Sequence, residues 1–99
     1  MKPPVRNTFH IVHDPVRQVT LLYGGYPPAP QPVFADTWIW NGATQTWTNP
    51  NPSPNPGPLV GHAMTFDTER ARVLLFGGAG GPALSAETWE WNGAAWKKR

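Results

Sequence analysis

Residues 35–43 read ADTWIWNGA, and residues 86–94 read AETWEWNGA. Seven of these nine positions are identical, and one of the two differences exchanges aspartate for glutamate and so keeps the charge. A second pair of stretches, DPVRQVTLLYGG at 14–25 and DTERARVLLFGG at 67–78, aligns without gaps at an offset of 53 residues. Self-similarity at a period of about fifty residues indicates one structural unit that occurs twice.

The offset between the copies falls along the chain, from 53 residues to 51 and then to 49 at Trp47 and Trp96. It falls because two loops of the first copy are each two residues longer, and repeated units are expected to differ in their loops. The expected organisation is a linker remnant at 1–7, a first unit at 8–49, a proline-rich linker at 50–60 and a second unit at 61–99.

Each unit is predicted to contain four short antiparallel strands. In the third strand Trp38 and Trp40 share one face and Ile39 takes the other, which is the period of a strand. Asn-Gly follows at 41–42 and at 92–93 and predicts a type I′ hairpin. Four such strands, repeated at this spacing, are typical of propeller blades. The predicted strands are 8–13, 19–23, 36–40 and a segment around Trp47, then 61–66, 72–76, 87–91 and a segment around Trp96.

The composition agrees with an all-β chain. There are 13 prolines, 10 glycines and 6 tryptophans in 99 residues. Proline breaks helix interiors, and no apolar period of 3.6 residues extends over a helix length. The chain contains no cysteine, so disulfide and thiolate chemistry are excluded.

The net charge is +2, and much of the basic excess lies near the two ends. Such tails are usually solubilising, so we expect no nucleic-acid partner. The sequence holds no apolar stretch of signal-peptide or membrane-spanning character. We therefore expect a soluble chain with no membrane partner, and the compartment is left undetermined.

The repeated residues resemble a kelch repeat of the kind found in bacterial kelch-containing proteins. The second copy shows GHAM at 61–64, RVLLFGG at 72–78, ETWEWNG at 87–93 and then Trp96. The first copy matches through LLYGG, DTWIWNG and Trp47, but TFHI at 8–11 replaces the GHAM pattern. The resemblance implies β-propeller blades in a non-catalytic module that holds proteins or, less often, glycans.

Residues that recur in both copies are expected to serve the fold. Double glycines suit strand ends, and tryptophans at equivalent positions suit packing between sheets rather than sugar stacking. The residues given this structural role are Gly24, Gly25, Trp38, Trp40, Trp47, Gly77, Gly78, Trp89, Trp91 and Trp96.

Two blades alone would leave two apolar sheet faces open to water. Kelch rings commonly have six or seven blades, and pairs of blades reach only the even number. We therefore expect a homotrimer that forms one six-bladed ring through head-to-tail contacts. Two or four chains per ring, an excised fragment of a longer array and an engineered piece are the alternatives.

The long proline-rich loops lie at one end of the predicted blades and form the candidate binding face. Tyr26, Phe34 and Gln31 are its candidate contact residues for a protein or glycan ligand. The competing interpretation is that the prolines only stiffen these connections and block edge pairing.

No catalytic, metal or cofactor signature is present, and we expect a non-enzymatic chain without a cofactor. His10 and His13 point to opposite faces of one strand, so they cannot chelate a metal together. Asp14 and Asp67 begin equivalent turns, where aspartate accepts hydrogen bonds from its own backbone. The alternative is a glycan, metal or enzymatic site assembled from several chains at the ring centre.

Overall fold

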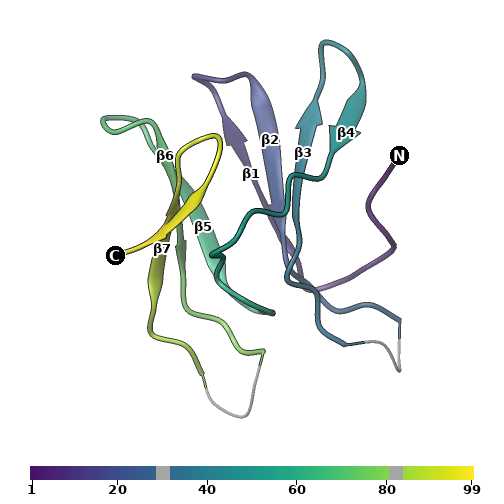
Figure 1. Cartoon of the computed structure of the whole chain (residues 1–99), viewed down its shortest axis with the longest axis vertical. Helices are drawn as coiled ribbons and strands as arrows, with labels where there is room; N and C mark the ends of the chain where they lie inside the picture. The colour runs from purple at the N-terminus through teal and green to yellow at the C-terminus, as the bar shows by residue number, and fades with distance from the viewer. Residues whose placement is uncertain (29–31, 81–83) are drawn as a thin grey trace.

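The computed structural model describes residues 1–28, 32–80 and 84–99. These residues form two four-stranded antiparallel sheets and contain no helix (Figure 1). The prediction of an all-β chain with two such sheets is confirmed. The first sheet has the order β1(His10–Asp14), β2(Val19–Tyr23), β3(Thr37–Asn41) and β4(Thr46–Thr48), and the second has β5(Ala63–Asp67), β6(Arg72–Phe76), β7(Thr88–Trp91) and β8(Trp96–Lys98).

The first strand of each sheet begins two residues later than predicted. Thr8 and Gly61 occupy equivalent positions and both have positive φ, 54° and 69°. A residue in this left-handed region turns the backbone out of the extended conformation. β1 and β5 therefore start only at His10 and Ala63.

The turn between β1 and β2 is organised by Asp14. Its Oδ1 accepts hydrogen bonds from the backbone N–H groups of Val16 (3.0 Å) and Arg17 (2.9 Å), and Asp67 accepts the equivalent pair in the second sheet. Burial alone would raise the pKa of Asp14, but the hydrogen bonds and charge of Arg17 lower it below its ordinary value. Both turns thus follow the prediction for an aspartate that caps its own backbone.

The prediction of type I′ turns after β3 and β7 is wrong. Such a turn needs positive φ at both central residues, and neither Asn41 nor Asn92 has it. The pairs Asn41↔Thr46 and Trp91↔Trp96 instead close four-residue loops. Each asparagine Oδ1 accepts hydrogen bonds from the N–H groups two and three residues further on, which stabilises the wider loop.

The sheets pack face to face, and their first strands β1 and β5 are neighbours (Figure 1). The main core fills the space between the sheets. Its buried members are Leu21, Tyr23, Leu59, Met64, Val73, Leu75, Trp89, Trp91 and Trp96.

Candidate functional site

The two sheets meet through unlike faces. The face of the second sheet that carries its tryptophans, called here its tryptophan face, packs onto the first sheet. The first sheet meets it with the face opposite to its own tryptophans, through Leu21 and Tyr23. Val12 and Ile39 are partly buried against the same core.

Tyr23 is the centre of this contact. Its ring lies edge-on to the indole of Trp96, with the centroids 5.3 Å apart, and its hydroxyl donates to the carbonyl of Gly57 (2.7 Å). The indole N–H of Trp96 donates to Oγ1 of Thr37 (3.0 Å) across the sheets. Burial raises the pKa of Tyr23, so the hydroxyl stays a donor.

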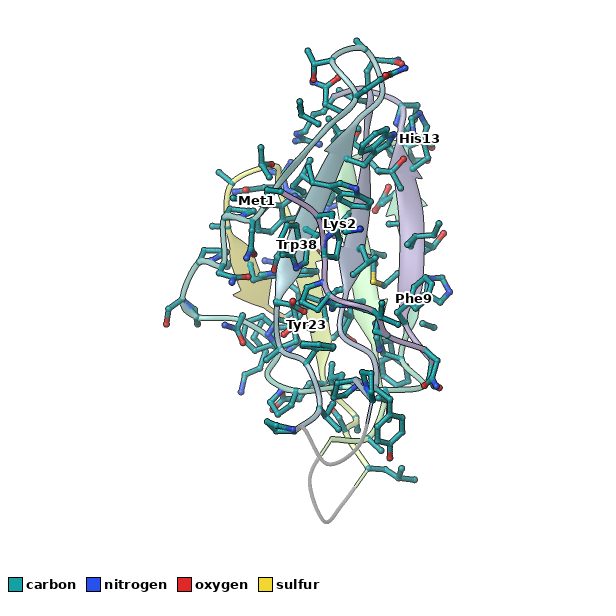
Figure 2. The ribbon with its side chains drawn as sticks, turned by 90° about the vertical axis from the view of Figure 1, so that its right-hand side faces the viewer. Met1, Lys2, Phe9, His13, Tyr23 and Trp38 are labelled. Carbon is teal, nitrogen blue, oxygen red and sulfur yellow. The ribbon has the colours of Figure 1, made fainter. Side chains whose placement is uncertain are left out.

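The first sheet carries its own tryptophan face on the outside. Trp40 and Trp47 are half-buried with ring centroids 5.2 Å apart, and Trp38 packs edge-on to Trp47. Ile11 on the same face is 50% exposed, whereas its equivalent Met64 is buried between the sheets. The N-terminal segment runs along this side of the first sheet (Figure 1), and in Figure 2 it lies over the face that carries Trp38.

The second sheet exposes the opposite kind of face. Phe76 takes the position that Tyr23 has in the first sheet, and it is 55% exposed where Tyr23 is 0% exposed. Near the outer strands this face is charged, because Glu90 replaces Ile39 and lies between Arg70 (3.0 Å) and Arg99 (3.2 Å). The two outer faces of the described chain are therefore one of each kind, and the tryptophan face is only partly exposed because Trp38 and Leu22 are buried.

A carboxylate two residues before a tryptophan recurs in both sheets and has a structural purpose. The indole N–H of Trp38 donates to Asp36 (2.7 Å), and that of Trp89 donates to Glu87 (2.9 Å). Arg6 also forms a bidentate ion pair with Asp36, with Nη1 2.6 Å from Oδ1 and Nη2 2.8 Å from Oδ2. Burial alone would raise the pKa of Asp36, but these partners lower it. The repeat DTW/ETW was a signal for this pairing in the sequence.

The double glycines lie immediately after β2 and β6, and all four have positive φ. At Gly24 (φ +72°) glycine is also required by packing. A Cβ there would stand 2.5 Å from the carbonyl oxygen of Leu59, on the linker to the second sheet. The double glycine thus lets that linker approach the first sheet closely.

The proline-rich loop after β2 and the N-terminal segment form an apolar groove of about 510 Å³. Phe34 lines the groove and stacks under the Arg6 guanidinium, 3.8 Å from the ring centroid. Tyr26 is 48% exposed, and its backbone pairs with that of Asn7. Gln31, the third candidate contact residue, lies outside the described residues. The groove is lined by Pro4, Val5, Pro27, Pro28, Val33 and Phe34, among others.

The fold brings two histidines together, and the sequence did not predict this pair. His10 and His13 lie at alternating positions of β1, as expected, but the His10 ring faces that of His62, with centroids 6.2 Å apart. Nε2 of His62 donates to the carbonyl of Tyr23 (2.9 Å). Burial lowers the pKa of His62. The two positions are not equivalent in the repeat, so aligning the copies could not reveal the pair.

Within the described ranges, no group of three or more histidine, cysteine or acidic side chains is placed to hold a metal ion. No helix in that part of the chain is long and apolar enough to cross a membrane. Comparison with models of known protein families and with curated proteins finds no match. The fold and its exposed faces thus define the chain as an all-β protein of two stacked sheets.

Proposed function

We propose that the chain is a two-blade unit of a kelch-type β-propeller that closes into a ring with further copies and serves as a non-catalytic binding scaffold. One observation carries the proposal. The interface between the two sheets joins a tryptophan face to an opposite face, and the two outer faces, on which Ile11 and Phe76 are exposed, are one of each kind. A second copy can therefore repeat the internal contact.

Such contacts are head-to-tail, and they form a closed ring when the rotation between units closes. Burying Ile11, Trp40 and Trp47 of one copy against Phe76 of the next removes apolar surface from water, at about 25 cal/mol per Å². The kelch resemblance favours six blades, which three chains supply. The proposed assembly is a homotrimer.

The proposed ligand surface is the apolar groove beside Phe34. It is lined by the 26–35 loop and by Pro4 and Val5 of the N-terminal segment, not by residues of the strands. Tyr26 is an exposed aromatic side chain of the same loop, and aromatic anchors are common in protein and glycan recognition. The expected partner is a protein or glycan ligand, with no chemical step.

A charge on the exposed tryptophan face tests the scaffold proposal. Ile11→Lys places an ammonium group where the next copy is expected to pack, and we expect sedimentation velocity to show single chains. Val16→Lys, at a 61% exposed turn residue, is the matched control and keeps the sedimentation of the unmodified protein. An Ile11→Lys protein that sediments like the unmodified one contradicts the proposal.

A further inference from the structure

His62 fills an inner hollow on the first sheet. Its ring lies edge-on to Tyr23, with centroids 5.9 Å apart, and its Nε2 donates to the Tyr23 carbonyl. The ring also reaches the backbone of Gly24, where a Cβ would stand 2.9 Å from Cε1 of His62. Contact between the blades at this point therefore depends on one aromatic side chain from the second blade.

Among residues 1–28, 32–80 and 84–99, no aromatic side chain fills the equivalent hollow on the second sheet. It measures about 560 Å³ and lies beside Phe76, Gly77 and Ala63. Gly77 has nearly the same φ as Gly24, +75° against +72°, but among the described residues a Cβ built on it would meet only the Ser85 carbonyl oxygen, at 3.6 Å. The backbone thus forms the same hollow in both blades, and in the part of the chain that the structure describes a side chain fills the first hollow alone.

Phe9 takes the place of His62 in the first copy, at the same offset of 53 residues. The backbone agrees with this alignment. A Cβ on Gly25 would lie 3.0 Å from Cβ of Phe9, and a Cβ on Gly78 would lie 3.0 Å from Cβ of His62. Phe9 is 43% exposed, so its ring is available to another chain.

We infer that Phe9 of one copy inserts into the hollow beside Gly77 and Phe76 of the next copy, an inference that rests on the proposed ring. Compared with His62 and the hollow that it fills, Phe9 and the hollow beside Gly77 are both less polar. Inside the chain, a histidine faces His10 and bonds a carbonyl. Between chains, the apolar ring of Phe9 would meet Ala63 and Phe76. Because Ala63 replaces the larger and polar His10, this hollow is less polar and has more room.

Phe9→Ala tests the contact. Truncating a buried aromatic ring is costly, so we expect the dissociation constant of the assembly to rise at least about a hundredfold in sedimentation equilibrium. Near-UV circular dichroism of the dissociated chain keeps its tryptophan signal, since the internal contact is untouched. Val16→Ala is the control and leaves the dissociation constant unchanged.

A compensating set of substitutions separates a specific contact from general loss of apolar surface. Phe9→His alone is expected to weaken association, because the imidazole would meet Ala63 and Phe76 in place of the His10 and Tyr23 rings that His62 contacts. Adding Ala63→His and Phe76→Tyr to Phe9→His rebuilds the internal set of side chains at the contact between copies, and association is expected to recover at least about tenfold over Phe9→His alone. Failure to recover overturns the proposed register.

The outcomes separate this inference from the proposed function. If the unmodified protein has the mass of one chain at every concentration, both the proposed ring and the Phe9 contact are overturned. If it associates and Phe9→Ala associates equally well, the ring stands and the Phe9 contact alone is overturned.

Discussion

The ring of Tyr23 stands edge-on to the indole of Trp96, with centroids 5.3 Å apart and planes at 73°. The two residues come from different sheets, and this contact is the centre of the interface between them. Their equivalents in the repeat, Phe76 and Trp47, lie on the two faces that remain exposed. The internal pair is therefore the template for the proposed contact between copies.

The Tyr23 hydroxyl provides the first prediction. Tyr23→Phe removes its hydrogen bond to the Gly57 carbonyl, and we expect the free energy of unfolding to fall by about 1 kcal/mol. Urea denaturation measures the change. Phe76→Tyr, at an exposed position, is the control and leaves the stability of the single chain unchanged, so an equal effect from both would contradict the template.

Equivalent tryptophans are expected to respond differently to truncation. Trp91 is buried between the sheets, and Trp91→Ala is expected to cost about 3–5 kcal/mol of chain stability. Trp40 is its half-buried equivalent on the outer face, and Trp40→Ala is expected to act mainly on association. Thermal melts at a dissociating dilution compare the two, and equal losses of stability there would argue against the assignment of the faces.

Acid sensitivity follows from Asp36. Its pKa is lowered from 3.8 in the folded chain, so its contribution is fully present above pH 3.8 and is lost as the pH falls through the lower folded-state value. Asp36→Asn is expected to cost roughly 1.5–3 kcal/mol at neutral pH, because it weakens hydrogen bonds to a charged group. Urea unfolding at a series of pH values below 5 is expected to show that the free energy of unfolding falls less steeply with pH for the variant. Parallel curves for the two proteins would contradict this explanation.

His62 sets a second pH dependence. Burial lowers its pKa below 6.5, so its contribution is fully present above pH 6.5 and is lost as the pH falls from there through the folded-state value. The neighbouring His10 ring disfavours a second positive charge. NMR titration of the imidazole signals is expected to show His62 titrating below the ordinary histidine value of 6.5, and a titration at or above that value would contradict the effect of its burial.

Much of the fold could be predicted from the sequence. The bounds of β2 and β6 match the predicted segments, because an aspartate-containing turn precedes each strand and a double glycine follows it. The hairpins after β3 and β7 were mispredicted, because the asparagine side chain stabilises a four-residue loop that the Asn-Gly pair alone does not reveal.

The candidate site could be predicted less well. The copies give the equivalent positions, but which tryptophan face is covered depends on how the sheets stack. The exposure of Phe76 and the hollow beside Gly77 follow from the order in which the sheets stack. Local sequence patterns do not reveal that order. The ion pair of Arg6 with Asp36 joins residues far apart in the chain, and an unrepeated arginine gave no signal for it.

The molar mass of the unmodified protein in solution tests the central claim most directly. Light scattering across a range of concentrations is expected to show a β-rich particle of three chains, each of 10.9 kDa. Masses of two or four chains would keep head-to-tail association and change the number of blades. A folded particle with the mass of one chain at every concentration would contradict the claim that the exposed faces bind further copies.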